Sequence, residues 1–491
     1  MPDGYTTVPL FGGGTSGKSL PVSAQKRVNL YCEPQQEPDR TQMALYTRPG
    51  LITQSFSITD PFSSTAPSTI VGPVRGISTA PQQVGGMDFV HAVIGNALVQ
   101  VQGRSQIVSY GPSFFATTGY VMVEDNGLQA ACADGGAGMI YGYSTIAPFS
   151  PTYWNSYANV PTGMRTVAFL GGRFFIDDPS NNGRFRWSAQ YDGTLFNALD
   201  YATAEQSPDP LSGVFEYRGQ LLLLGTQTME FWQLTGDLSV ISKVVGSTIM
   251  WGSRAIFSVK KIGNQMGMIA RSTAMGTYQV IMLDGYNATP VSTPDVEADI
   301  ANEVSPDSIS ASVLTHPGHI FYVIHLSTKS WAYDVSTSTW SQWSTDGGRF
   351  AGMFAFQLGT RALITDYRDQ RIYVADQNTY TDSSLTMIRE VTSRHQFESG
   401  KRMRCFEMWI DMEVGDGLSS GQGSAPIGML TISKDGGRTY GNEIQISLGA
   451  MGQYTARMQA TRLGISRDWV FKVRVSDPIK VVALQGFARF G

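Results

Sequence analysis

The sequence predicts an all-β protein with a β-propeller-like domain, and three observations favour this fold class. Glycine supplies 53 of the 491 residues, which suits a chain with many tight turns. Charged residues make up 15%, where about 25% is typical of soluble domains, so long solvated helices are not expected. Between residues 71 and 382, short apolar runs alternate with glycine, asparagine or aspartate, as in strands joined by turns.

The apolar runs of this region predict strand–turn–strand hairpins in order along the chain. In each case a turn containing glycine, asparagine or aspartate separates two runs that are rich in strand-forming residues. Predicted hairpins lie at residues 91–100, 166–177 and 216–225, a further run lies at 228–232, and another blade is expected to run through 362–366 and 371–376.

A three-strand meander with an aromatic residue in each strand is predicted at residues 319–343. Its Trp331, Asp334, Trp340 and Trp343 resemble the pattern of a kelch-like propeller blade. Blades of about 40–50 residues fit six or seven times into the region, and circular closure leaves few exposed sheet edges. A set of packed β-sandwiches is the competing architecture.

The chain is expected to have three parts. Residues 1–60 contain several prolines and little periodicity, which predicts an extended N-terminal arm of the kind that often lies across a neighbouring subunit. Residues 61–385 are expected to form the propeller-like domain. Residues 386–491 are expected to form a C-terminal β-sandwich-like domain, in which residues 415–426 make a flexible loop.

One short helix is predicted within the propeller region, at residues 293–304. Thr293 is a plausible cap, and proline and acidic residues follow it in the first turn. Val296, Ile300 and Val304 would then share one face, which would cover the edge of a sheet.

Composition excludes several classes of protein. The three scattered cysteines indicate reduced thiols and not a disulfide scaffold. The first residues lack the pattern of a signal peptide, and no apolar run is long enough to span a bilayer. A net charge of −4 provides no general basic field, so DNA that touches the protein is expected to be confined and not gripped.

Residues 12–19, GGGTSGKS, satisfy the pattern of a phosphate-binding loop. Such a loop needs a buried strand before it and a helix that begins at the lysine. Here Pro9 interrupts the preceding segment and Pro21 follows closely, so a nucleotide site is not expected. The glycines are interpreted as part of the extended arm.

A second motif resembles the Asp-box, SxDxGxTW, with tyrosine in the place of tryptophan. Its aspartate can accept turn N–H groups, its glycines can adopt positive φ, and its aromatic ring can pack under a hairpin. The motif predicts a structural hairpin and nominates no pair of catalytic carboxylates. Its positions are Ser433, Asp435, Gly437, Thr439 and Tyr440.

Two further groups of residues could form sites. His316, His319 and His325 could supply metal ligands, but a strand spacing of six residues separates the last two by about 20 Å. Arg457 and two further arginines recur every five residues near the C-terminus and could face an anionic partner, although a solvated face is the simpler interpretation. The other two are Arg462 and Arg467. No catalytic, cofactor-binding or metal-binding residue is nominated.

Several segments together resemble one family, the packaged-DNA stabilisation or tail hub proteins of short-tailed bacteriophages. Residues 25–34 and 46–51 resemble its opening signature, and residues 174–210 and 433–478 resemble its middle and its end. Cys32 and Tyr440 depart from the family pattern. The signature positions are Arg27, Asn29, Leu30, Tyr31, Pro49, Gly50, His319, Trp331, Asp334 and Trp340.

The resemblance implies a homo-hexamer in the virion tail, below the portal and its adaptor ring, assembled in the cytoplasm of the host. Such hubs extend and close the DNA channel, stabilise the packaged genome, receive a tail needle or nozzle protein, and seat tailspikes or fibres. It implies no cofactor, no membrane insertion and no sequence-specific binding of the passing double-stranded DNA. The expected function is therefore structural and not enzymatic.

Two alternatives stay open at this stage. The Asp-box and the aromatic residues also fit a propeller-type glycosidase that acts on host surface polysaccharide. A carbohydrate-binding propeller without catalysis is the third hypothesis. Release of sugar by the purified chain would favour the first alternative, and glycan binding by the isolated monomer would favour the second.

Overall fold

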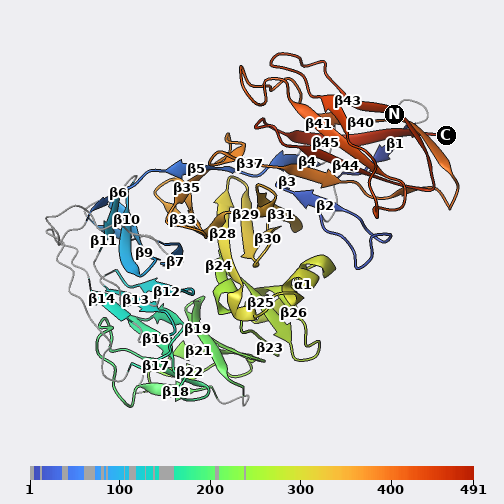
Figure 1. Cartoon of the computed structure of the whole chain (residues 1–491). Helices are drawn as coiled ribbons and strands as arrows, with labels where there is room; N and C mark the ends of the chain where they lie inside the picture. The colour runs from blue at the N-terminus through green and yellow to red at the C-terminus, as the bar shows by residue number, and fades with distance from the viewer. Residues whose placement is uncertain are drawn as a thin grey trace.

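The computed structural model of the chain contains a ring of small sheets with a β-sandwich at its side (Figure 1). It describes residues 5–10, 14–35, 43–59, 72–78, 82–84, 87–103, 106–109, 118–127, 129–136, 139–142, 160–204, 209–236 and 239–491. These residues form eight sheets, of which one lies wholly in the sandwich and the other seven each form or contain one blade of a propeller. The predicted all-β propeller with a C-terminal β-sandwich is confirmed.

The first three blades come from the N-terminal half of the propeller. Blade 1 contains β6 (Ser57–Thr59), β7 (Val74–Ile77), β8 (Gln82–Val84), β9 (Met87–Ile94), β10 (Ala97–Gln102) and β11 (Gln106–Ser109). Blade 2 contains β12 (Met122–Asp125), β13 (Gln129–Ala133) and β14 (Met139–Gly142). Blade 3 contains β15 (Val167–Leu170), β16 (Arg173–Asp177), β17 (Arg184–Trp187) and β18 (Tyr201–Thr203).

Blades 4 and 5 share one apolar core, which includes Phe231 and Met268. Blade 4 contains β19 (Leu211–Tyr217), β20 (Gln220–Gly225), β21 (Met229–Leu234) and β22 (Ile241–Lys243). Blade 5 contains β23 (Trp251–Gly252), β24 (Lys260–Ile262), β25 (Gln265–Ser272), β26 (Tyr278–Asp284) and β27 (Asn287–Pro290), with the short 3-10 helix η1 (Ile256–Ser258) before β24.

Blade 6 is the meander that the aromatic residues predict, and blade 7 completes the ring. Blade 6 contains β28 (Ser310–His316), β29 (His319–His325), β30 (Ser330–Asp334) and β31 (Thr339–Thr345), preceded by the 3-10 helix η2 (Pro306–Ser308) and followed by the short β32 (Gly348–Arg349). Blade 7 contains β33 (Gly352–Leu358), β34 (Arg361–Asp366), β35 (Ile372–Asp376), β36 (Thr381–Asp382) and β37 (Leu385–Thr386), together with β5 (Gly50–Gln54) from the N-terminal segment. The ring closes where β33 contacts β7.

The sandwich packs two sheets over one apolar core, in which Trp469 and Phe471 are fully buried. One sheet contains β1 (Tyr5–Val8), β3 (Leu30–Pro34), β4 (Met43–Thr47), β40 (Met403–Met412), β43 (Met458–Ser466) and β45 (Val482–Phe490). The other contains β2 (Lys26–Val28), β38 (Arg389–Thr392), β39 (Gln396–Phe397), β41 (Ile427–Ser433), β42 (Ile444–Ser447) and β44 (Asp468–Val475).

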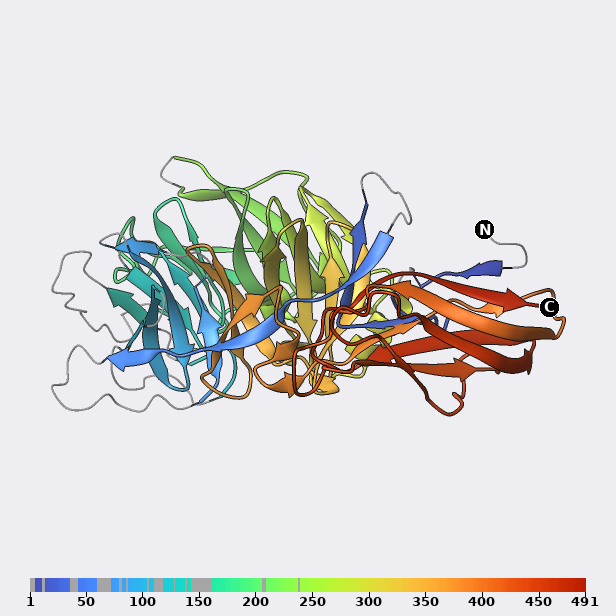
Figure 2. The same ribbon diagram turned by 90° about the horizontal axis from the view of Figure 1, so that it is seen from above.

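The N-terminal segment, for which the sequence predicts an extended arm, forms strands that pair within the same chain. β1, β3 and β4 belong to the sandwich, β5 pairs antiparallel with β35, and β6 pairs parallel with β11. The segment therefore runs from the sandwich across the propeller (Figure 2). The physical reason is that blade 7 supplies only part of its own strands, and the N-terminal segment satisfies the open edge of β35.

The predicted helix is shorter than expected. The helix α1 spans Pro294–Ala301, and Val296 and Ile300 face the propeller core. Val304 lies beyond its end and is fully exposed, so its predicted place on the buried face is wrong. The helix ends at Ala301, so Val304, the last apolar residue of the predicted pattern, lies in solvent. No helix among the described residues is long and apolar enough to cross a membrane.

Replacement of Gly50 tests whether the closing strand β5 stabilises the ring. A Cβ atom at Gly50 would lie 2.2 Å from the carbonyl oxygen of Thr379 and 2.6 Å from that of Thr381. We expect Gly50→Ala to lower the free energy of unfolding by about 1–3 kcal/mol, because the backbone must move to admit the methyl group. Urea denaturation measures the change. Gly348→Ala is the control, since the nearest atom there is 3.7 Å away; an equal loss in both variants would contradict the prediction.

Candidate functional site

The strand β2 joins the propeller to the sandwich through main-chain hydrogen bonds. On one side Val28 pairs in parallel with Gln342 of β31, the last long strand of blade 6. On the other side β2 pairs antiparallel with β38, the first strand of the C-terminal domain. A single sheet therefore runs from β28 of the propeller through β2 to β42 of the sandwich. We call this region the joint.

The next strand, β3, contributes side chains to both domains. Leu30 and Cys32 are buried in the core of the sandwich. Tyr31, between them in sequence, is buried in a propeller cluster, where its ring centroid lies 5.6 Å from that of Phe321. Since successive side chains of a strand point to opposite faces, one strand at this place fills two cores.

A fully buried ion pair ties the N-terminal segment to blade 7. The guanidinium of Arg48 donates from Nη1 to Oδ1 of Asp382 at 3.0 Å and from Nη2 to Oδ2 at 2.6 Å. Neither side chain is more than 1% exposed. The guanidinium also lies 4.6 Å from the ring centroid of Phe350, and it donates to the carbonyl oxygens of Pro49 and Ser344. Pairing and hydrogen bonding are what allow these two charges to be buried.

Asn29 connects three parts of the chain around this ion pair. Its Oδ1 accepts from Nε of Arg48 at 2.8 Å and from the backbone N–H of Ser344 at 2.9 Å. Its Nδ2 donates to the carbonyl oxygens of Ser344 and Ile388. Only an amide side chain offers two donors beside a double acceptor, and asparagine also tolerates the positive φ of 55° found here. Both properties explain asparagine at this position.

The ion pair at the joint predicts a large loss of stability on truncation. We expect Arg48→Met to lower the free energy of unfolding by about 3–5 kcal/mol, because it leaves the Asp382 carboxylate buried without a cationic partner. Arg218→Met is the matched control, since the Arg218–Asp284 pair is exposed and such pairs contribute little. Urea denaturation of both variants measures the difference. Similar losses in the two variants would show that Arg48 has no special role.

His319 forms a second polar bridge at the joint. Its Nδ1 lies 2.7 Å from Oδ2 of Asp334 in blade 6, and its Nε2 lies 2.6 Å from Oε2 of Glu33 in β3. Burial acts to lower the pKa of His319, but the hydrogen bonds to Asp334 and Glu33 outweigh it and raise the pKa above its ordinary value. A protonated imidazole can donate to both carboxylates at once, so the bridge is strongest when His319 is charged.

The raised pKa of His319 predicts a pH dependence of stability. The folded protein holds this proton more tightly than the unfolded chain, in which histidine has a pKa of about 6.5. The contribution is therefore complete below about pH 6.5 and is lost as the pH rises through the raised pKa of the folded state. We expect the stability difference between the wild type and His319→Gln to be larger at pH 6 than at pH 9.

Denaturation of both proteins at matched ionic strength across this pH range measures that difference. The subtraction removes the opposite contribution of His325, whose pKa burial lowers. A difference that stays constant or grows with pH would contradict the assignment.

The other signature positions lie close to this bridge or in the blade beside it. Arg27 is 1% exposed, and its Nη1 donates to the hydroxyl of Thr339 at 3.4 Å. The indole N–H of Trp331 donates to Asp299 of α1 at 2.9 Å. The indole N–H of Trp340 donates to the carbonyl oxygen of Val291 at 2.7 Å. Gly50 lies in the closing strand β5.

A cleft of about 980 Å³ opens beside β2, between α1 and the Asp-box hairpin, and is lined in part by Lys18. The segment that resembles a phosphate-binding loop lies along it, although Gly12 and Gly13 are outside the described residues. The backbone N–H of Ser16 donates to Oδ2 of Asp295 at 2.8 Å. A turn and not a helix follows Ser19. In this structure the loop binds a carboxylate of its own chain.

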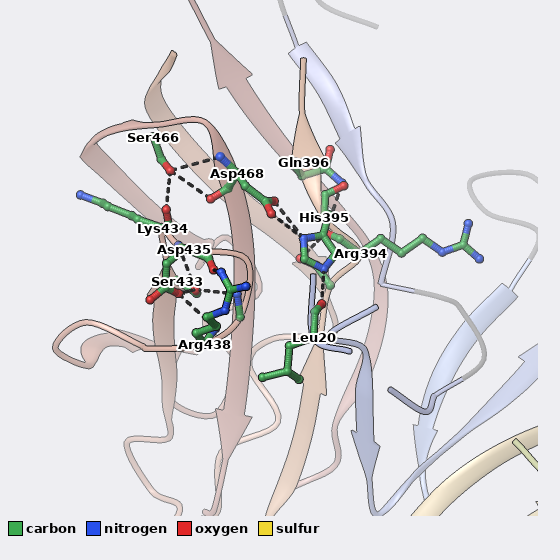
Figure 3. A network of polar contacts seen from close by, with 12 residues as sticks. Leu20, Arg394, His395, Gln396, Ser433, Lys434, Asp435, Arg438, Ser466 and Asp468 are labelled. Carbon is green, nitrogen blue, oxygen red and sulfur yellow. Dashed lines mark hydrogen bonds and ion pairs between the residues drawn. The ribbon is translucent and has the colours of Figure 1, made fainter. Parts of the chain in front are cut away.

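The Asp-box residues form a turn that packs on the N-terminal segment. Oδ1 of Asp435 accepts from the hydroxyl of Ser433 at 2.7 Å (Figure 3). It also accepts from the backbone N–H of Thr439 at 2.9 Å. The bonds from Thr439 and Ser433 lower the pKa of Asp435. Gly437 has a φ of 85°, and a Cβ atom there would lie 2.5 Å from that of Ala24, just before β2.

Close to the Asp-box, His395 links the sandwich to the same N-terminal turn. Its Nδ1 lies 2.8 Å from Oδ2 of Asp468, and its Nε2 donates to the carbonyl oxygen of Leu20 at 2.9 Å (Figure 3). The aromatic residue of the motif, Tyr440, lies under the ammonium group of Lys472, which is 3.8 Å from its ring centroid. These contacts hold the hairpin against the N-terminal turn, which is consistent with a folding element.

The remaining candidate groups are not brought together. His316 and His319 face each other across a hairpin, but His325 lies at the other end of β29, buried between Ser312 and Ser330. Among the described residues, no group of three or more His, Cys, Asp or Glu side chains could hold a metal ion. Arg457 stacks at 5.5 Å from the ring centroid of Trp409, while Arg462 and Arg467 are exposed, which is consistent with a solvated face.

Comparison with known families decides which architecture this is. Residues 6–380 match the family described as "Bacteriophage P22 Gp10, beta-propeller", and residues 388–491 match "Bacteriophage P22 Gp10, beta-sandwich". The chain belongs to the bacteriophage P22 Gp10 family. The resemblance to tail hub proteins that the sequence indicates is therefore confirmed.

One relative within this family is the tail hub protein gp10 of Salmonella phage P22, which is 21% identical over 346 residues, or 64% of this chain and 67% of the relative. Among solved structures, virginiamycin B lyase from Staphylococcus aureus is similar with a TM-score of 0.41 at 10% identity, over 62% of this chain and 95% of that chain. The WD40 domain of Pan2 from Neurospora crassa has a TM-score of 0.40 at 11% identity, over 70% of this chain and 98% of that chain.

Sequence reasoning missed Arg48 and Asp382, the ion pair beside the joint. Arg48 stands directly before the Pro49–Gly50 pair of the signature, so the same segment that resembles Gp10-family proteins could have nominated it. Asp382 lies 334 residues away in a turn-rich stretch, and no local pattern distinguishes it from a solvent-exposed aspartate. The pairing is visible only in three dimensions.

Proposed function

We propose that this chain is a structural, non-enzymatic subunit of a phage tail hub in the virion tail. The joint carries this proposal, because one hydrogen-bonded sheet and a buried ion pair hold a propeller and a sandwich as a single rigid body. A wall that retains a genome under pressure needs such rigidity. Membership in the Gp10 family and the tail hub name of the P22 relative support the same role.

In this role the chain forms a homo-hexameric ring that extends the DNA channel below the portal and its adaptor ring. Large apolar side chains at the surface support permanent contacts with other subunits. On and beside blade 3, Leu199 is 84% exposed and Tyr191 is 66% exposed. On the sandwich, Phe397 is 68% and Tyr454 is 71% exposed. Neighbouring copies, a tail needle or nozzle protein, and tailspikes or fibres are the proposed occupants of these surfaces.

Double-stranded DNA passes this wall without sequence-specific binding. The net charge of −4 supports this proposal, because counterion release from phosphates needs many clustered cations. The proposed hub needs no cofactor. The chain stabilises the packaged genome because it closes the DNA channel together with the tail component that occupies the far end of that channel.

Cryo-electron microscopy of intact virions tests the proposal. We expect density for a propeller with an attached sandwich in six copies around the channel below the portal. A different location, such as the capsid surface or the tip of a fibre, would refute the tail hub assignment. Turnover of host polysaccharide by the purified chain, abolished by truncation of one polar side chain, would refute the non-enzymatic role.

A further inference from the structure

A pocket of about 650 Å³ lies over the centre of the propeller. Its lining residues lie in the strands of six blades or in the segments beside those strands, and blade 4 contributes none of them. A volume of this size accommodates a small molecule. The charged and tyrosine side chains of its lining are Arg75, Tyr120, Asp134, Arg165, Asp307, Arg349 and Tyr367.

Two of the arginines are held by the protein itself. Arg165 pairs with Asp307 at 3.0 Å, and Arg254 reaches the same carboxylate at 3.3 Å. The guanidinium of Arg75 donates to the carbonyl oxygens of Gly95, Thr118 and Gly119, at 2.6 to 2.9 Å. Arg75 is 2% exposed, so its position in the pocket wall is rigid.

Arg349 differs from these two. It forms no ion pair with any carboxylate in the described part of the chain, and its Nε and Nη2 atoms are buried without a hydrogen-bond acceptor there. The ring of Tyr367 packs against its guanidinium, with 4.3 Å between Cζ and the ring centroid. Arg349 as a whole is half-buried, and a guanidinium whose buried N–H donors lack acceptors is unfavourable unless an anion compensates it.

Lys260 adds a further cation behind the pocket, within electrostatic reach of the carboxylate of Glu124. Burial lowers the pKa of His325 well below its ordinary value, and the charges of Arg349 and Lys260 lower it further. Burial also lowers the pKa of Lys260 to about 8. The centre of the propeller thus holds Arg349 and Lys260 close enough to repel a proton from the same histidine.

We propose that this axial pocket binds a small oxyanion, a phosphate or a carboxylate, with Arg349 as its principal cation. Arg75 supplies a second, fixed positive charge at the wall. Tyr120 and Tyr367 provide aromatic walls on which a compact organic anion can pack, and the Arg165–Asp307 pair limits the space. Guanidinium groups suit this task because their planar N–H donors match oxyanion geometry.

Isothermal titration calorimetry of the full chain with inorganic phosphate and, separately, with citrate tests the proposal. We expect saturable binding of at least one of the two anions, weakened about tenfold or more in Arg349→Met, in line with the loss of a charge-assisted bond. Arg349→Lys keeps the charge and is expected to bind with intermediate affinity. Titration with sodium chloride at equal ionic strength separates specific binding from general screening.

Arg404→Met is the matched control, since Arg404 lines a separate basic depression on the sandwich with Arg402, Lys434 and Arg467. It is expected to bind as the wild type does. Binding that is lost in Arg404→Met but kept in Arg349→Met would overturn the proposal, as would the absence of saturable binding of both anions. If Arg349→Met does not give a native circular dichroism spectrum, the Arg349→Lys variant is used in its place. Wild-type affinity in Arg349→Lys together with loss of anion binding in Arg404→Met would refute the axial site.

Discussion

The pairing of β2 with a propeller strand on one side and a sandwich strand on the other is the constraint on which the rest of the structure depends. Because the two domains share a sheet, their relative movement requires main-chain hydrogen bonds to break. The strand after β2 adds side chains to both cores, so sliding at this place would also expose apolar surface. A short N-terminal segment therefore determines the geometry of the whole chain.

The buried polar groups at the joint determine where the N-terminal segment lies more than they add to the free energy of unfolding. Burying Arg48 and Asp382 costs the free energy of desolvating two charges. The attraction between them and the hydrogen bond to Asn29 offset this loss only when all three side chains are correctly placed. A misplaced N-terminal segment would leave two charges buried without partners. The His319 bridge adds a contact between β3 and blade 6 that depends on protonation.

Much of this fold could be predicted from the sequence, because strands, tight turns and aromatic meanders are local patterns. The meander around Trp331 and Trp340 is a propeller blade, and the resemblance of residues 25–51 to a tail hub signature identified segments that lie at the joint. The destination of the N-terminal segment could not be predicted, since extended residues with several prolines fit equally well on a neighbour or on the same chain. The Arg48–Asp382 pair and the axial pocket depend on contacts between residues far apart in sequence. A single amino-acid sequence contains no local pattern that predicts such contacts.

The rigidity of the joint can be measured directly by pulsed electron spin resonance between labels on the two domains. Thr289 of β27 and Gln445 of β42 are exposed positions for introduced cysteines, and the native Cys32, Cys132 and Cys405 are buried with raised thiol pKa values. The account predicts one narrow distance distribution in the otherwise unaltered protein, which becomes broader in Arg48→Met. A broad or multiple distribution in the protein with the intact joint would show that the propeller and the sandwich move independently, and would contradict the account.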